Sequence, residues 1–169
     1  MIISKETKML LFRFRSYGKN NFIEKHKKIL CEEAYVWMMK LGKRTSTDKL
    51  QDILQDILDA GGWMVLRAPK AEGSKSYVAR FIAFSEEEPE DMGYPEYYQE
   101  ILDDEEKEYS DGNAIMQWFK VVQITEIDEI NAEKLVMAKS EKKVNEVIGT
   151  TRTAVMFVKN NEDIEIKEV

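Results

Sequence analysis

The stretch from residue 35 to residue 67 constrains the fold most, because it predicts a strand, a helix and a second strand in succession. Tyr35–Leu41 is an apolar, aromatic-rich run of strand length. Within Asp48–Ala60 the apolar residues recur at the i, i+3, i+4, i+7, i+8 spacing of one buried helical stripe. They are Leu50, Ile53, Leu54, Ile57 and Leu58. The pair Gly61-Gly62 predicts the end of this helix, and Trp63–Arg67 predicts the next strand.

The rest of the chain predicts further short strands with helices between them. Strands are expected at Lys8–Arg15, Tyr77–Phe84, Ala114–Thr125 and Thr153–Lys159, and at the alternating tail Ile164–Val169. Helices are expected from Phe22 to about Glu33, near Leu102, from Asn131 to about Lys139, and within Ser140–Ile148. No regular βαβ repeat is present. The sequence therefore predicts an α+β fold with a small mixed or antiparallel β-barrel and interleaved short helices.

The length of 169 residues suits one domain, whose core needs no metal or disulfide to be stable. We expect a single domain, residues 1–169, built from a strand and helix addition (1–34), a barrel (35–159) containing an acidic insertion (86–108), and an edge strand or tail (160–169). The sequence contains no phosphate loop, dinucleotide fingerprint, His/Cys metal cluster or nucleophile elbow. It therefore predicts no cofactor, and it favours a protein that is not an enzyme.

Negative charge is concentrated in one segment, Glu86–Glu108. Twelve acids and one lysine give this segment a net charge of −11. The whole chain has a net charge of −7, so the rest of the chain carries +4. Three tyrosines in the segment argue against disorder, because disordered segments are poor in aromatics. Two interpretations stay open. The segment is either a hydrated surface loop, or the counterpart of a basic face that meets nucleic acid, in which case it is kept away from that face or covers it when empty.

The single cysteine and the single histidine indicate structural rather than chemical roles. Cys31 has no partner within the chain, and together with nine methionines and the lack of a leader segment it favours a reducing cytoplasm. The apolar runs are far shorter than the roughly 20 residues that a membrane crossing needs. His26 falls on the apolar face of a predicted helix. We expect it to be a core or rim residue bonded to backbone, not a catalytic base.

The order of segments over Tyr35–Lys159 resembles the PUA-like superfamily, especially its EVE, ASCH and YTH members. The segments that resemble the family are Tyr35–Lys40, Leu50–Leu58, Trp63–Arg67, Tyr77–Phe84, Trp118–Ile124, Asn131–Leu135 and Arg152–Val158. The last is the most specific, because Arg152-Thr-Ala-Val-Met is similar to the family's terminal arginine, small residue and Val-Met strand. The Gly-x-Lys-x-x-Glu-x-Arg signature of ASCH domains is absent, and no catalytic set is visible that would favour an ASCH-like hydrolase.

The resemblance implies a non-catalytic binding module whose pocket holds a nucleobase, modified or unmodified, in DNA or RNA. Such a pocket needs aromatic faces for stacking and cations for phosphates. The ligand-binding residues expected on this basis are Trp37, Lys40, Trp63, Arg67, Trp118, Arg152 and Thr153. Each tryptophan has core packing as its alternative role. The alternative function is an acidic interaction or regulatory protein, for example a phage-encoded one, that contacts a basic protein partner through Glu86–Glu108.

Overall fold

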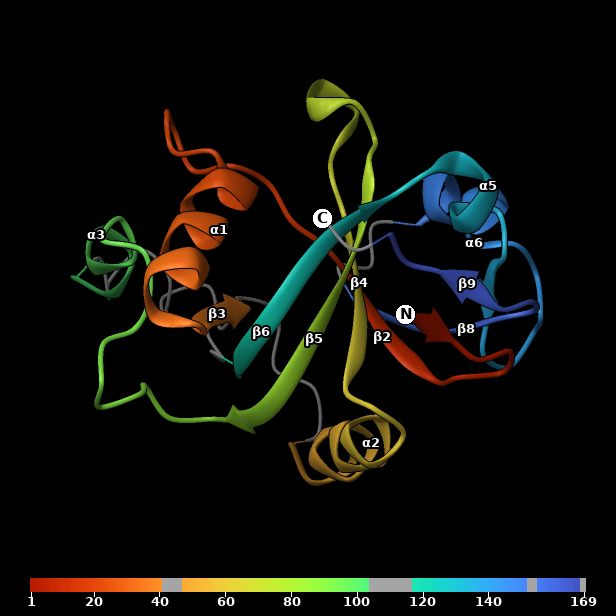
Figure 1. Cartoon of the computed structure of the whole chain (residues 1–169), viewed down its shortest axis with the longest axis horizontal. Helices are drawn as coiled ribbons and strands as arrows, with labels where there is room; N and C mark the ends of the chain where they lie inside the picture. Colours follow the sequence, from red (N-terminus) through yellow and green to blue (C-terminus); the bar gives the residue numbers. More distant parts are fainter. Residues whose placement is uncertain (41–46, 104–116, 152–154, 168–169) are drawn as a thin grey trace. The chain divides into compact units, whose positions relative to one another are not determined.

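The computed structural model describes residues 1–40, 47–103, 117–151 and 155–167, and these form a mixed α+β structure (Figure 1). The strands are β1 (Ile2–Ile3), β2 (Met9–Arg13), β3 (Val36–Lys40), β4 (Trp63–Arg67), β5 (Ser76–Ser85), β6 (Gln117–Ile127), β7 (Leu135–Met137), β8 (Val155–Asn160) and β9 (Ile164–Glu165). The helices are α1 (Phe22–Glu33), α2 (Thr47–Asp59), α3 (Tyr98–Asp103), α5 (Glu129–Ala132) and α6 (Val144–Val147), with 3₁₀ turns η1 (Lys70–Glu72) and η2 (Ile148–Thr150). The predicted α+β class is confirmed.

Seven strands form one mixed sheet in the order β3-β6-β5-β4-β2-β8-β7, and β1 pairs with β9 in a second sheet. Strand β2 runs parallel to β4 and antiparallel to β8. The first four residues of β2 are buried, as in a strand covered on both faces. The N-terminal strand, expected to be an addition to a barrel, is thus an interior strand of the sheet. The order of the described pairings is open, with β3 and β7 at its ends.

The chain divides into two compact units. Unit 1 comprises Met1–Arg15, Ile57–Arg80 and Ile124–Val169, and unit 2 comprises Ser16–Asp56 and Phe81–Gln123. Strands β5 and β6 and helix α2 each contribute residues to both units. The single domain expected from the sequence stays a prediction.

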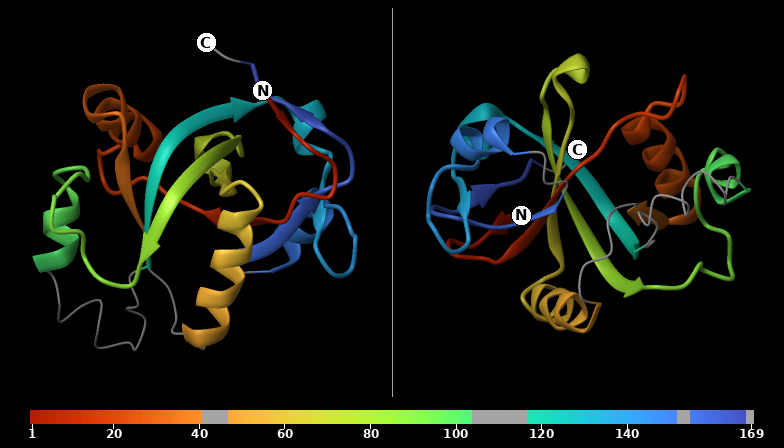
Figure 2. Two further views of the ribbon diagram at one scale, coloured as in Figure 1. Left: turned by 60° about the horizontal axis from the view of Figure 1, so that its bottom comes forward. Right: turned by 180° about the vertical axis from the view of Figure 1, so that it is seen from behind.

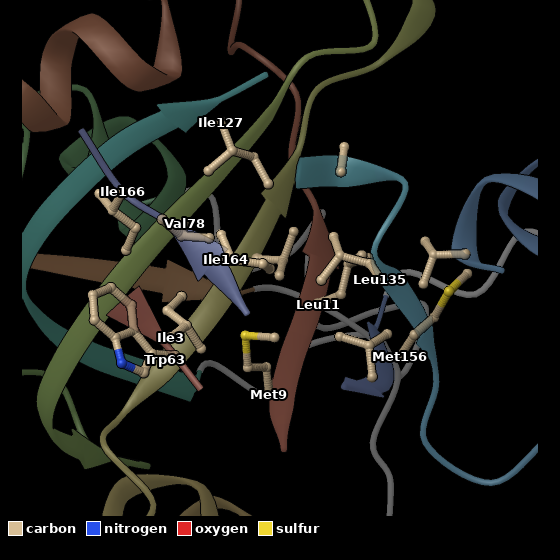
Figure 3. Packing of buried hydrophobic residues seen from close by; sticks show 14 residues of the cluster. Ile3, Met9, Leu11, Trp63, Val78, Ile127, Leu135, Met156, Ile164 and Ile166 are labelled. Carbon is tan, nitrogen blue, oxygen red and sulfur yellow. The ribbon is translucent and has the colours of Figure 1, made fainter. Parts of the chain in front are cut away.

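Unit 1 has an apolar core built from strands of both sheets (Figure 3). Trp63 from β4 lies in this core with side chains from β2, β5 and β8, and it is only 8% exposed. Ile3 of β1 and Ile164 of β9 add to the same cluster. The first and last described strands therefore lie side by side, as their antiparallel pairing requires (Figure 2).

The strand–helix–strand frame predicted from the sequence is confirmed. The bounds of its elements differ from the predicted ones by no more than one residue. Strand β4 has the predicted bounds, and Leu54 of α2 is fully buried. Gly61 and Gly62 have positive φ values of 129° and 74°, and the Gly62 N–H donates to the Ile57 carbonyl at 2.9 Å. These two glycines satisfy the last carbonyls of α2 in a conformation that other residues rarely adopt.

Unit 2 has a second core, in which tyrosines of the acidic segment take part. Helix α1 packs beside β3 (Figure 1), and the Asn21 side chain caps it by accepting from the Glu24 N–H at 3.0 Å. Tyr94, Tyr97 and Tyr98 are buried against Trp118. The described part of the acidic segment is therefore anchored by its aromatic residues, and its carboxylates remain outside.

The predicted helix from Asn131 to Lys139 is wrong in its second half. Only α5 is helical there, and Leu135–Met137 is strand β7, which pairs antiparallel with β8. Leu135 and Val136, which are neighbours in the sequence, are both buried. A strand with both faces covered buries consecutive residues, and the sequence pattern alone does not distinguish this from a short helix.

Candidate functional site

Two half-exposed aromatic side chains stand next to each other at strand β3 in unit 2. Tyr35 directly precedes β3 and Trp37 is its second residue, so the two side chains share one face of the strand. The antiparallel register places Trp37 opposite Lys120 of β6. Lys120 is also partly exposed. We call Tyr35, Trp37, Lys120 and the nearby Asp91 the aromatic–lysine site.

Lys120 lies against both rings. Its Nζ is 4.4 Å from the centre of the Tyr35 ring and 5.9 Å from that of Trp37. Such contacts stabilise a cation by about 0.5–1 kcal/mol at exposed positions. None of the ion pairs found among the described residues involves Lys120. Its ammonium group therefore lies beside both rings without an ion pair in the described residues.

The acidic segment supplies a carboxylate to this site. Asp91 accepts hydrogen bonds from the Tyr35 hydroxyl at 2.8 Å and from Trp37 Nε1–H at 3.3 Å. Burial alone would raise the pKa of Asp91. The bonds from Tyr35 and Trp37, helped by a backbone N–H and by Lys120, outweigh burial and lower this pKa. Asp91 is thus ionised at neutral pH and occupies the polar edge of the aromatic pair.

The backbone next to Asp91 fixes this arrangement. The Trp37 N–H donates to the Gly93 carbonyl at 2.7 Å, which joins the acidic segment to the outer side of β3. A Cβ atom at Gly93 would lie 2.8 Å from Tyr35 Cε2, closer than such atoms approach. A side chain at this position would therefore force the Tyr35 ring to shift.

His26 is confirmed as a core residue bonded to backbone. It is fully buried, and its Nδ1 lies 2.7 Å from the Phe22 carbonyl oxygen. A carbonyl only accepts, so Nδ1 carries the proton and Nε2 accepts from the Tyr98 hydroxyl at 2.5 Å. The Tyr98 oxygen in turn accepts from the Met39 N–H at 3.1 Å. This chain of bonds ties α1, α3 and β3 together in unit 2.

The residues expected at the nucleobase pocket are distributed over both units. Trp37 and Lys40 lie on β3 in unit 2, and Trp118 is fully buried in the core of that unit. Trp63 lies in the core of unit 1, and Arg67 ends strand β4 there. Arg152 and Thr153 lie outside the described residues. Trp37 is therefore the partly exposed tryptophan, although it also packs against the core of unit 2, and core packing accounts for the other two.

Sequence reasoning did not single out Tyr35, Lys120 and Asp91. The sequence does indicate that Tyr35 lies beside Trp37, because residues two apart in a strand point to the same face. Lys120 becomes a neighbour of Trp37 only through the β3–β6 register, which the sequence does not specify. Asp91 is one of many acids in its segment, and its role depends on the close approach of Gly93 to β3.

Two kinds of site have no support in the described part of the chain. Among residues 1–40, 47–103, 117–151 and 155–167, no group of three or more His, Cys, Asp or Glu side chains is placed to hold a metal ion. Within the same ranges, no helix combines the length and apolar character that a membrane crossing needs. Comparison with protein-family models, curated proteins and solved structures gives no match for this chain.

Proposed function

We propose that this protein is a non-catalytic binding module that recognises a nucleobase, modified or unmodified, in unpaired DNA or RNA. The observation that carries the proposal is the half-exposed pair Tyr35 and Trp37 with the Lys120 ammonium beside both rings. An unstacked base gains about 1–3 kcal/mol by stacking on an aromatic side chain, and a neighbouring lysine attracts the backbone phosphate. The aromatic–lysine site offers both groups within one strand pair.

In this proposal the Asp91 carboxylate competes with the phosphate of the nucleic acid for the aromatic–lysine site. Its carboxylate holds the Trp37 and Tyr35 polar atoms in the free protein and lies near Lys120. A phosphate that approaches Lys120 meets the negative charge of Asp91, so the acidic segment weakens the binding of nucleic acid until it moves aside. The segment then covers the site when it is empty, which is one of the two interpretations that the charge distribution left open.

The PUA-like barrel is the fold that we propose with this function. The mixed α+β class, the strand–helix–strand frame and the long strands β5 and β6 support it. An experimental structure in which the seven-stranded sheet closes on itself would agree with this proposal. A sheet that stays open would contradict it and would leave the nucleobase site to be judged by binding alone.

The proposal is tested by the anisotropy of labelled single-stranded oligonucleotides, with modified and unmodified bases, at two salt concentrations. Trp37→Ala removes a stacking face and should weaken binding roughly 5- to 150-fold with little change in the salt slope. Lys120→Ala should lower the slope of log affinity against log salt by about 1. Phe157→Ala removes another exposed aromatic ring, on β8 in unit 1, and should change neither quantity.

Asp91→Asn keeps an oxygen that accepts from Tyr35 and Trp37 but removes the charge. We expect it to tighten binding roughly two- to tenfold at low salt, because repulsion of the phosphate is lost. Weaker binding in this variant would mean that Asp91 contacts the ligand instead of competing with it. If every oligonucleotide binds with a Kd above about 1 mM at low salt, the nucleic-acid function itself is refuted.

A basic protein surface is the second candidate ligand, favoured by the exposed carboxylates of the acidic segment. Glu86, Glu87, Glu90, Glu96 and Glu100 are all exposed, and none appears in the ion pairs found among the described residues. Because Tyr94, Tyr97 and Tyr98 are buried, the carboxylates would make such a contact. This function follows if no oligonucleotide binds and neutral substitutions in the segment abolish binding of a basic protein.

A further inference from the structure

Arg67 at the end of β4 is an arginine without an acidic partner in the described residues. Its Nη1 donates to Ser76 Oγ at 3.0 Å and to Asn145 Oδ1 at 2.9 Å. No ion pair found in the described ranges includes Arg67, and its Nε and Nη2 have no hydrogen-bond partner there. Nη1 is thus held by two hydrogen bonds, and the Nε–Nη2 edge remains available. This edge can donate two parallel hydrogen bonds to an oxyanion.

A second arginine lies beside the first in unit 1. Arg13 ends β2, and the parallel register of β2 and β4 pairs it with Arg67. Arg13 Nη2 donates to the Ile148 carbonyl, whereas its Nε is buried without a partner in the described part of the chain. Burial lowers the pKa of Arg67, and the charge of Arg13 lowers it further. The nearby charge of Glu133 raises this pKa and offsets part of the effect. Two adjacent cations that form no ion pair in the described residues are stabilised by an anion that joins them.

Arg67 lines a pocket of about 540 Å³ that lies wholly in unit 1. This volume suits a small molecule. The lining also contains carboxylates, which we call the acidic rim: Glu126, Glu129 and Glu133. Glu126 pairs with Lys75 at 3.4 Å, and Glu133 accepts from Asn145 Nδ2 at 2.7 Å. Glu129 is exposed and has no ion pair in the described residues. The pocket lining therefore combines the Arg67 guanidinium group with an acidic rim.

We propose that this pocket binds a small zwitterion, with a phosphate or carboxylate on the Nε–Nη2 edge of Arg67 and an ammonium group at the acidic rim near Glu129. Ser76 and Asn145 position the guanidinium group, and the neighbouring Arg13 adds positive charge. A simple anion lacks the second contact and is repelled by the rim. The pocket is independent of the aromatic–lysine site, because all of its lining residues belong to the other unit.

Calorimetric titration of the full chain with phosphoethanolamine, β-alanine and inorganic phosphate tests the proposal. One or both zwitterions should bind saturably and at least fivefold more tightly than inorganic phosphate, and the tighter one identifies the oxyanion. Arg67→Lys keeps the charge but removes the two-nitrogen edge, so it should weaken zwitterion binding at least tenfold. Arg80→Lys changes an exposed arginine of the same unit and should have no effect. Glu129→Gln should weaken the zwitterion severalfold and leave phosphate no weaker.

The outcomes separate cleanly. Saturable binding of a zwitterion that survives Arg67→Lys places the ligand elsewhere and overturns the proposal, as does equal affinity for phosphate and zwitterion. The proposal is also overturned if neither zwitterion binds saturably at concentrations up to about 10 mM. If Arg67→Lys fails to fold by circular dichroism, Asn145→Asp replaces it. That variant places a carboxylate next to Arg67, which should compete with the ligand and abolish binding.

Discussion

At the scale of single residues, the buried imidazole of His26 has the best-defined environment. Its ring donates to the Phe22 carbonyl and accepts from the Tyr98 hydroxyl, so both nitrogens are used by the neutral form. Burial lowers the pKa of His26 to about 4, and the backbone bond offsets only part of this. Because the chain has a single histidine, its titration is separable from that of other groups. His26 therefore links pH to the stability of unit 2.

This linkage predicts a loss of stability on acidification. The folded pKa of about 4 lies below the unfolded value of 6.5, so the unfolded state binds the proton first. Stability is complete above pH 6.5 and falls as the pH drops from 6.5 towards 4. Between pH 7.5 and pH 5 the free energy of unfolding should fall by roughly 2 kcal/mol, as measured with urea. His26→Gln should remove this slope, and an unchanged slope in the variant would contradict the assignment.

Single residues also show how far sequence reasoning reaches. The helical position of His26 indicated a buried, backbone-bonded role, because an apolar face is a local property of the sequence. For Trp37, Trp63 and Trp118 the sequence left pocket and core roles open. Their exposures differ because Trp37 lies at the end of the strand order, whereas Trp63 and Trp118 lie inside cores. That difference depends on strand order, which a single sequence does not contain.

At the scale of elements, the acidic segment protects the outer side of β3. Strand β3 is at one end of the sheet order, where a strand exposes unpaired N–H groups that favour aggregation. The Trp37 N–H donates to the Gly93 carbonyl, and the Met39 N–H donates to the Tyr98 hydroxyl. The described part of the segment therefore satisfies two N–H groups of β3, and its buried tyrosines anchor it there. Its removal would expose this strand.

Helix α2 gives the stability prediction at this scale. Leu54 is 0% exposed in the middle of the helical stripe. Leu54→Ala leaves a cavity as well as losing buried apolar surface, so it should lower the free energy of unfolding by roughly 2–5 kcal/mol. Asp52→Ala, on the exposed side of the same helix, should change it by less than about 0.5 kcal/mol. Equal effects in urea unfolding would mean that the stripe does not face a core.

Elements differed in how well the sequence predicted them. Helices α1 and α2 and strand β4 were predicted because caps, glycines and periodicity are all local. Strand β7 was missed because its three residues are strand only through pairing with β8. Strand β1 has two residues, and its partner β9 lies at the far end of the chain. Short strands of this kind are specified by tertiary contacts.

At the scale of the whole molecule, the sequence predicted the α+β class but not the strand order or the two compact units. The parallel pairing of β2 with β4 explains this difference, because it joins segments separated by about fifty residues. It also brings Arg13 and Arg67 together, which no sequence motif indicated. The two proposed sites lie in different units, so each can be lost without the other.

The central claim is that Trp37 is the tryptophan that meets nucleic acid, and the three indole N–H resonances test it most directly. Each tryptophan gives one such signal in a ¹⁵N–¹H spectrum of the full chain, and Trp37→Phe assigns the relevant one. During titration with a single-stranded oligonucleotide, the Trp37 signal should shift saturably as its bond to Asp91 changes. The signals of the buried Trp63 and Trp118 should stay in place. A Trp37 signal that stays fixed while oligonucleotide binds, or equal shifts of all three, would contradict the account.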